Sequence, residues 1–255
     1  MIHRRLTTLL LLCGCASMSQ AAITVSGQVH NPGPITLQPG ARLLDVITAS
    51  QPDAQGYWLG AAWLHRPLLE RQARLKAGVL FDLDTLHGAA LAAGRERRAG
   101  VAARLYQQVL ALPVTGRQVA ALDPVAVEVG FAPNLLVSDG DRLVYPPRPD
   151  RVQVVGAVAA ACSLAFAPMQ PVRDYLQACP PLAEADTDYV WLIQPDGRVT
   201  RLGIAPWNRE EGAPPAPGST LLVPIRSDDL DPPTPELNQQ LAEFLATQPL
   251  AEVTP

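Results

Sequence analysis

The order of apolar and polar positions repeats along this chain, because the pattern that begins at Val25 recurs without a gap from Val154. In each copy, apolar and polar residues alternate as in a half-buried strand, a turn follows, a second strand returns, and apolar residues then line one side of a short helix. Gly27 matches Gly156 in this register. A fixed repeat outweighs any local propensity. The sequence therefore predicts an α+β fold with two tandem β-grasp modules.

The predicted boundaries follow from the composition of the connecting segments. Residues 22–147 form the first module, and residues 148–226 form the second after the proline-rich stretch Pro146–Pro149. In the second module, a hairpin turn is expected at Pro195–Gly197, because glycine accepts the turn geometry. Residues 227–255 are predicted to form a linker followed by an amphipathic helix.

The first module is interrupted by an insertion at about residues 58–113, in which apolar residues follow the helical period. One stripe consists of Leu68, Leu75, Val79 and Leu83, and the other of Val101, Leu105, Val109 and Leu112. Two antiparallel helices would bury these stripes against each other. Asp84, which lies between the stripes, is expected to cap the second helix through its carboxylate. We therefore predict a helical hairpin inserted in the first β-grasp module.

The last predicted helix begins at Pro235, a residue that suits the first turn of a helix. Leu237, Leu241, Phe244 and Leu245 form one apolar stripe along it. A helix of about 13 residues reaches roughly 20 Å, which is short of the ~30 Å hydrocarbon core of a bilayer. The sequence leaves two uses of the stripe open: packing on its own domain, or binding a partner or a membrane surface.

The first residues of the chain are typical of an export signal. Arg4 and Arg5 precede a run of apolar residues that is too short to span a bilayer, and cleavage is expected after Ala21. Residues 1–21 would then be a signal peptide, and the mature protein would be periplasmic. Alternatively, Cys15 lies in a sequence similar to a lipobox, and its acylation would make the protein an outer-membrane lipoprotein.

Composition and charge narrow the range of partners. The chain has 20 basic and 24 acidic residues and a formal net charge of −4, which is not the basic signature of nucleic-acid binding. The predicted helical hairpin differs, because basic residues outnumber acidic ones there, among them Arg95, Arg97 and Arg98. This basic surface is a candidate site for an acidic polysaccharide or an acidic partner. The alternative is that these charges lie on solvated helix faces.

Two cysteines remain after removal of the signal, Cys162 and Cys179. Cys162 is expected at the first hairpin turn of the second module, from which a strand leads away and a helix returns to Cys179. The strand advances about 3.3 Å per residue and the helix returns about 1.5 Å per residue, so the two cysteines end close together. We therefore predict a disulfide, worth about 3 kcal/mol in the chain-entropy treatment. The alternative is a reactive thiol, for which the sequence offers no activating partner.

The sequence has no recognisable catalytic or metal-binding motif. The histidines are scattered without metal-ligand spacing, and no nucleophile elbow, phosphate-binding loop or dinucleotide fingerprint occurs. Asp139 and Asp141 bracket a turn glycine and are expected to form that turn. We therefore expect a non-enzymatic protein without cofactor or metal. The alternative is a polysaccharide-modifying enzyme with a site between the modules, in which Glu128 and Asp141 would be the carboxylates to test.

Five short motifs occur in order along the chain: Tyr57–Ala61, Leu112–Arg117, Leu122–Pro124, Trp207–Asn208 and Ala216–Gly218. Together they resemble the GfcC-like capsule-biosynthesis proteins of the bacterial periplasm. The resemblance implies an accessory of capsule or exopolysaccharide assembly and export, with modules similar to the soluble-ligand-binding β-grasp (SLBB) domains of outer-membrane polysaccharide export proteins. In those exporters the C-terminal helix takes part in an outer-membrane helical barrel, for which the helix predicted here is too short.

The resemblance also implies which residues meet a ligand. Arg117 matches the family's Gly-Arg motif after the hairpin, and its guanidinium suits a carboxylate or sulfate group; the alternative is an arginine that satisfies loop carbonyls. Trp207, which precedes Asn208, could stack on a sugar face or anchor its own loop. The expected partners are the outer-membrane polysaccharide export machinery and an acidic polysaccharide.

Overall fold

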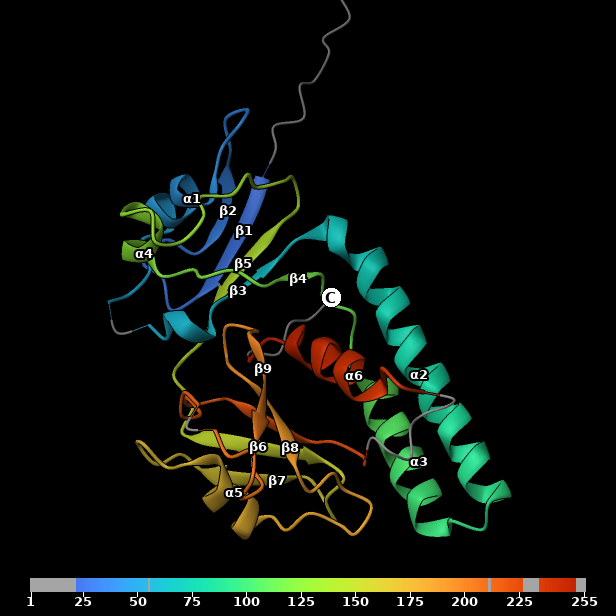
Figure 1. Cartoon of the computed structure of the whole chain (residues 1–255). Coiled ribbons are helices and arrows are strands. Elements are labelled where there is room, and N and C mark those ends of the chain that lie inside the picture. The colour runs from blue at the N-terminus through green and yellow to red at the C-terminus, as the bar shows by residue number, and fades with distance from the viewer. Residues whose placement is uncertain (1–21, 55, 211, 227–233, 251–255) are drawn as a thin grey trace, which may run out of the picture.

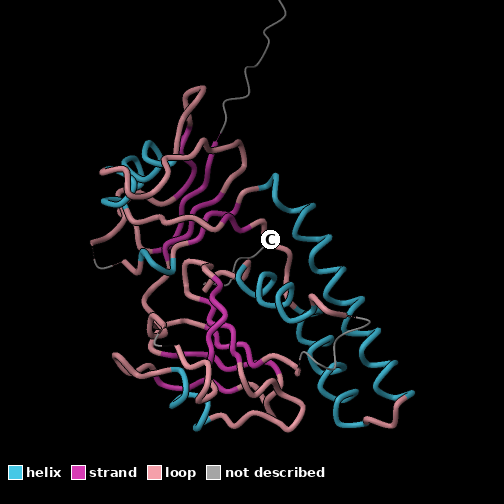
Figure 2. Tube along the Cα trace, viewed as in Figure 1, coloured by secondary structure: helices cyan, strands magenta, loops and turns pink. Residues whose placement is uncertain are grey.

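The computed structural model describes residues 22–54, 56–210, 212–226 and 234–250, and its strands form two separate five-stranded sheets (Figure 2). The first sheet contains β1 (Ala22–Gly27), β2 (Gly33–Thr36), β3 (Ala62–Leu64), β4 (Arg117–Gln118) and β5 (Arg142–Tyr145). The second contains β6 (Arg151–Gly156), β7 (Cys162–Ala165), β8 (Tyr189–Ile193), β9 (Val199–Gly203) and β10 (Thr220–Val223). The predicted α+β class is confirmed.

Both sheets have the same strand order, β2-β1-β5-β3-β4 in the first and β7-β6-β10-β8-β9 in the second. In each sheet the first strand lies antiparallel to the second and parallel to the last. A helix follows the second strand in both cases, α1 (Leu43–Ser50) in the first module and α5 (Val172–Ala178) in the second. The repeat in the sequence therefore corresponds to two copies of one module.

The matched glycines explain part of this repeat. Gly27 has φ of 92° and Gly156 has φ of 103°, in the region that favours glycine. A Cβ atom at Gly27 would lie 2.0 Å from the carbonyl oxygen of Tyr145, and one at Gly156 would lie 2.1 Å from that of Val223. Each glycine thus allows the first strand to lie directly against the end of the last strand of its sheet.

The insertion forms two long antiparallel helices, α2 (Leu69–Ala92) and α3 (Glu96–Ala111), which run down beside the second module in Figure 1. β3 lies within the range assigned to the insertion, so the two helices occupy only part of that range. Two 3-10 turns, Trp58–Gly60 and Arg66–Leu68, flank β3. All three residues of β3 are buried, so this strand lacks the alternation by which a half-buried strand is recognised.

The turn between the two helices also lies further along the chain than predicted. α2 continues through Asp84 to Ala92, so Asp84 is in the middle of a helix and does not cap α3. The apolar stripe of α2 continues through Leu86 and Ala90, both of which are buried. Gly94, with φ of 69°, provides the turn instead.

The two modules have separate cores. The first core lies between the first sheet, α1 and α4 (Pro124–Glu128), and includes Leu43, Trp63 and Tyr145. The second core contains residues of the second sheet and α5 together with residues of α2, α3 and the C-terminal helix α6 (Leu237–Ala246). The helical hairpin therefore leaves the first module, where it originates, and packs into the core of the second.

α6 is built into this second core. Leu237, Leu241 and Phe244 are 0%, 2% and 0% exposed. At the start of the helix, the Asn238 side-chain amide donates to the carbonyl of Ile225 at 2.7 Å, and its oxygen accepts from the amide of the same residue at 3.1 Å. Of the two uses that the sequence left open for the stripe, this arrangement is packing on the protein's own chain.

Cys162 and Cys179 form a disulfide with their Cα atoms 6.1 Å apart, which confirms the predicted pairing. The bond joins the start of β7 to the residue after α5, so it closes the strand and helix of the second module. The first module has Gly33 and Ser50 at the matching positions. Because disulfides form and persist in oxidising environments, this bond indicates an oxidising compartment.

Candidate functional site

A cavity of about 710 Å³ lies over the second sheet, on the face that points away from α5. Its floor is formed by Gln153 and Val155 of β6 and by Thr220 and Leu222 of β10. The parallel register pairs Thr220 with Gln153 and Leu222 with Val155. Since alternate residues of a strand point to the same face, these four side chains lie together beneath the cavity.

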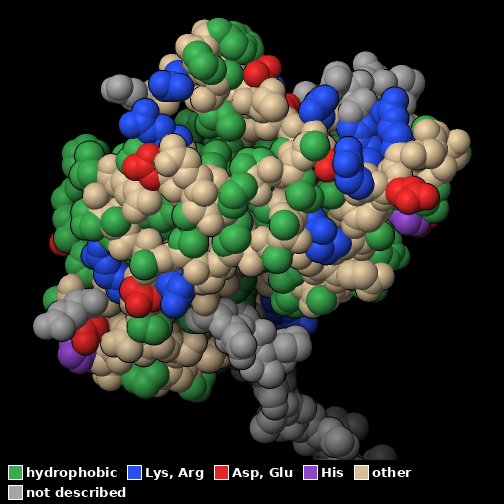
Figure 3. Space-filling model, turned by 90° about the horizontal axis from the view of Figure 1, so that it is seen from below, with side chains coloured by type: hydrophobic (Ala, Val, Ile, Leu, Met, Phe, Trp, Pro, Cys, Tyr) green, Lys and Arg blue, Asp and Glu red, His purple; other side chains and the backbone are tan. Residues whose placement is uncertain are grey.

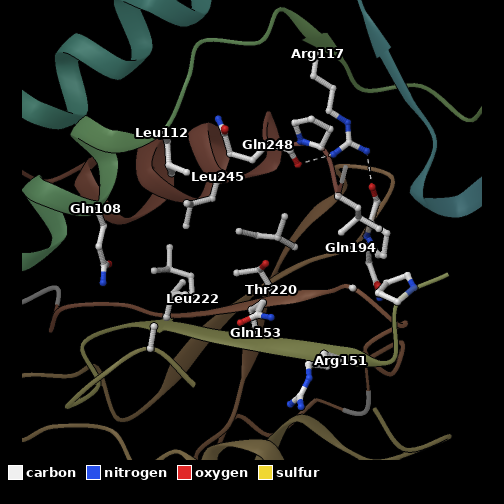
Figure 4. Close-up of a pocket in the computed structure, with 18 of the residues that line it drawn as sticks. Gln108, Leu112, Arg117, Arg151, Gln153, Gln194, Thr220, Leu222, Leu245 and Gln248 are labelled. Atoms are coloured by element: carbon white, nitrogen blue, oxygen red, sulfur yellow. Dashed lines mark hydrogen bonds between the residues drawn. The ribbon is translucent and has the colours of Figure 1, made fainter. Parts of the chain in front are cut away.

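The opposite wall of the cavity is helical. It is made by Leu105, Gln108 and Val109 of α3, by Leu112 directly after α3, and by Leu241 and Leu245 of α6. Figure 4 shows Leu112 and Leu245 on one side of the hollow, with Leu222 and Thr220 on the other. The proline-rich linker Pro146–Pro149 contributes to the lining as well. The cavity therefore exists because helices from distant parts of the chain cover this sheet without filling the space above it.

The lining combines aliphatic side chains with amide, hydroxyl and guanidinium groups. Gln108, Gln153 and Thr220 supply neutral polar groups, and Arg148 and Arg151 supply positive charge. Among the described residues that line the cavity, none is acidic. A largely apolar pocket with a few polar groups is the usual form of a binding site. Amide and guanidinium groups donate hydrogen bonds, so the cavity suits a ligand with apolar faces and oxygen acceptors.

Arg117 lies at the edge of this cavity (Figure 4). Arg117 itself is 4% exposed. Its guanidinium donates to the carbonyls of Gln248 at 3.0 Å, Ala246 at 3.3 Å and Ala61 at 3.4 Å, and also to that of Pro195. Burial lowers the pKa of Arg117 to about 10, against the opposing influence of Asp196. Arg117 thus joins the first module, the β8–β9 turn and the end of α6. Of the two roles considered for Arg117, these contacts correspond to the arginine that satisfies loop carbonyls.

Tyr57 makes a second link between the modules. Its hydroxyl donates to the carbonyl of Pro217 at 2.7 Å, and the guanidinium of Arg148 lies 5.6 Å from the centre of its ring. Burial raises the pKa of Tyr57 to about 12. Tyr57 and Arg117 both belong to motifs that carry the family resemblance, and both connect the first module to the second.

Trp207 and its neighbour Asn208 have different roles in the structure. The Asn208 side chain accepts a hydrogen bond from the amide of Ala205 and donates one to the carbonyl of Asp188, each at 3.1 Å. Trp207 is 69% exposed and forms a T-shaped pair with Tyr189, with the ring centres 6.4 Å apart. Asn208 therefore holds the loop together, whereas the indole of Trp207 is a surface group.

The predicted basic surface is partly internal. Arg98 is 5% exposed, and Nε of Arg97 lies 2.8 Å from the carboxylate of Glu184 in the second module. Arg104 donates to the carbonyl of Val158 at 2.6 Å. Arg95 is exposed beside them, and basic side chains gather at the end of the helical hairpin (Figure 3). The expectation that this basic surface is exposed is wrong for Arg98, because the part of α3 that carries it packs against the second module.

The carboxylates considered for an enzyme lie outside the cavity. Asp141 is fully buried and accepts hydrogen bonds from the Trp63 indole and the Ser138 amide, each at 2.9 Å. Nδ1 of His65 lies 3.0 Å from the same carboxylate. Glu128 is exposed on α4. Asp141 therefore fixes its turn, as expected, and also connects that turn to β3.

The described part of the chain has neither a cluster of metal ligands nor a membrane-spanning helix. No group of three or more histidine, cysteine, aspartate or glutamate residues is placed to hold a metal ion. No helix there is long and apolar enough to cross a membrane. Cys15 and the predicted signal peptide lie outside the described residues.

Several residues of the site were not found from the sequence. Gln108, Gln153 and Thr220 have no motif, because their common feature is that they face one cavity from three different elements. Asn238 was also missed, although a polar residue within an apolar helical stripe is a signal that could have singled it out.

This architecture defines a tandem β-grasp protein whose two modules share a helical hairpin and are closed by a C-terminal helix. Two family models match the chain. The model described as "Capsule biosynthesis GfcC, N-terminal" matches residues 19–145, and the model described as "Capsule biosynthesis GfcC C-terminal" matches residues 160–249. The chain is 30% identical to YjbG of Escherichia coli (strain K12) over 246 residues, which cover 96% of this chain and 98% of YjbG. The protein therefore belongs to the GfcC capsule biosynthesis family and is a distant homologue of YjbG.

Proposed function

We propose that this protein is a non-enzymatic periplasmic accessory of capsule or exopolysaccharide assembly and export. In this role it binds the polysaccharide, the outer-membrane export complex, or both. Membership of a capsule biosynthesis family supports the process, and the disulfide together with the export signal in the sequence supports the compartment.

The cavity over the second sheet is the observation that carries the binding role. Its walls come from α3 of the hairpin, the linker, the second sheet and α6, so segments from distant parts of the chain contribute to it. Aliphatic side chains with amide and guanidinium groups at their margins suit a saccharide or a protein segment, both of which combine apolar surface with oxygen acceptors. Leu237 and Phe244 of the α6 stripe are buried in the core, so in this proposal a ligand in the cavity meets only Leu241 and Leu245 of that stripe.

A matched pair of substitutions on α3 tests the role of the cavity. Gln107 and Gln108 are adjacent and both exposed, but of the two only Gln108 lines the cavity. In a polysaccharide-producing strain that lacks the chromosomal copy, Gln108→Trp should lower surface polysaccharide toward the level of the deletion strain. Gln107→Trp should restore the normal amount. Equal polysaccharide in the deletion and complemented strains would overturn the proposal.

Incubation of the purified protein with capsular polysaccharide separates the binding role from the enzymatic alternative. We expect retention of the polymer without new reducing ends. Release of sugar that is lost on Glu128→Gln or Asp141→Asn would establish an enzyme instead. Mass spectrometry of the mature N-terminus distinguishes the two forms of export: a free Ala22 corresponds to a periplasmic protein, and an acylated Cys15 corresponds to a lipoprotein.

A further inference from the structure

The exposed indole of Trp207 has little part in holding the fold together. The residue lies in the loop after β9, and its side chain is 69% exposed. Aromatic rings stabilise a fold mainly by removing their large apolar surface from water, and this ring leaves most of its surface in water.

The loop that carries Trp207 is nevertheless held firmly. Besides the two side-chain bonds of Asn208, the amide of Ile204 donates to Asp188 at 2.8 Å, and that of Glu210 donates to Gly203 at 3.1 Å. A Cβ atom at Gly203 would lie 2.0 Å from the carbonyl oxygen of Asn208, so the loop sits directly on the backbone of β9. The indole is therefore presented by a fixed loop rather than by a loose one.

Two side chains of the sheet extend this surface. Tyr189 is opposite Gly203 in the register of β8 and β9, and Arg201 is opposite Trp191, so all these positions share one face. The guanidinium carbon of Arg201 lies 3.5 Å from the centre of the Tyr189 ring. The rings of Tyr189 and Trp207 meet at 89°. Arg201, Tyr189 and Trp207 thus form a continuous row, which we name the aromatic row.

We propose that the aromatic row binds an acidic sugar residue of a polysaccharide. Carbon–hydrogen groups on one face of a pyranose ring carry partial positive charge, and the face of an indole carries partial negative charge, so the two surfaces are complementary. Arg201 is exposed, and its position over Tyr189 orders the guanidinium, which donates charge-assisted hydrogen bonds to a carboxylate. The absence of a side chain at Gly203 lets the loop that carries Trp207 lie directly against β9. This assignment rests on the proposed function and adds a ligand class to it.

Binding of purified protein to alginate, a polyuronate, and to dextran, a neutral glucan, tests the assignment. Trp207→Ala should weaken alginate binding about tenfold or more, and Trp207→Phe should weaken it less because an aromatic face remains. Arg201→Gln should reduce alginate binding while leaving dextran binding unchanged, and the effect of Arg201 should diminish at high salt.

Phe81→Ala is the matched control, because Phe81 is 70% exposed on α2, outside the aromatic row. It should bind alginate as the wild type does, and all variants should keep the wild-type melting temperature. Wild-type protein that does not bind alginate, or a Trp207→Ala variant that binds it equally well, would overturn the inference. If the row instead recognises a protein, alginate binding will not depend on Trp207.

The outcome is separable from that of the proposed function. Reduced surface polysaccharide in the deletion strain, combined with alginate binding that does not depend on Trp207, would reject the aromatic row and leave the accessory role intact. Unchanged polysaccharide in the deletion strain would reject the accessory role whatever the purified protein binds.

Discussion

The two β-grasp modules have the same strand order but differ in how their sheets are covered. The core of the first module is covered by α1 and α4, which belong to that module, and its described residues include none of α2 or α3. The second module has α5 on one face, and α2, α3 and α6 add to its core from other parts of the chain. The same strand order can therefore have a core formed within its own module in one copy and a core completed by helices from distant segments in the other.

This difference explains why the cavity lies in the second module. α3 and α6 contact the second sheet through their buried residues and leave space above part of it. Gln153 and Thr220 lie under such a space, whereas Phe244 lies at a point of full contact. The shared helices thus stabilise the second module and form the walls of its cavity at the same time.

The first test of this comparison is the burial of α6 in the second core. Phe244→Ala should lower the free energy of unfolding by about 3–5 kcal/mol, because it removes a fully buried aromatic ring and leaves a cavity. Phe81→Ala, at a ring that is 70% exposed, should change it by less than about 0.5 kcal/mol. Urea denaturation measures both. A small effect at Phe244 would mean that α6 is only loosely attached.

The disulfide provides a second contrast between the modules. Replacement of Cys162 and Cys179 by alanine should cost about 3 kcal/mol, since the bond restricts the unfolded chain. A reducing agent should destabilise the wild type by a similar amount and leave the double variant unchanged in urea denaturation. Equal sensitivity of the two proteins to reduction would show that the bond does not carry this stability.

The sequence predicted those features that depend on local pattern. The two modules, the disulfide and the stripe of α6 follow from periodicity and spacing within short segments, and all three are present. Association of the hairpin with the second module could not be predicted, because Leu83 and Leu105 have the same apolar pattern whichever core they join. The partners of Arg117 were equally hidden, since backbone carbonyls have no sequence signature and these four come from three separate segments of the chain.

Arg117 tests whether the contact between modules needs the geometry of a guanidinium. Arg117→Lys keeps the charge but has fewer donors in a different arrangement, so we expect a loss of about 2 kcal/mol in unfolding free energy. Arg198→Lys, at an exposed arginine that pairs with Asp196 and keeps its charge on substitution, should change stability by less than about 0.5 kcal/mol. Unchanged stability in Arg117→Lys together with lost ligand binding would favour the ligand role that the family resemblance implied.

Among the substitutions at buried contacts, Tyr57→Phe has the smallest expected effect on the free energy of unfolding. This effect also depends on pH in a defined way. Tyr57→Phe removes the hydrogen bond to Pro217 and should cost about 1 kcal/mol near neutral pH. Burial raises the pKa of Tyr57 from its ordinary 10.0 to about 12, so the folded state holds this proton more tightly than the unfolded chain does.

The stability that Tyr57 contributes through this proton is therefore complete below pH 10 and is lost as the pH rises toward 12. Urea denaturation at pH 8 and pH 11 should accordingly show a smaller difference between wild type and Tyr57→Phe at the higher pH. A difference that stays constant would mean that the hydroxyl of Tyr57 is not enclosed between the modules.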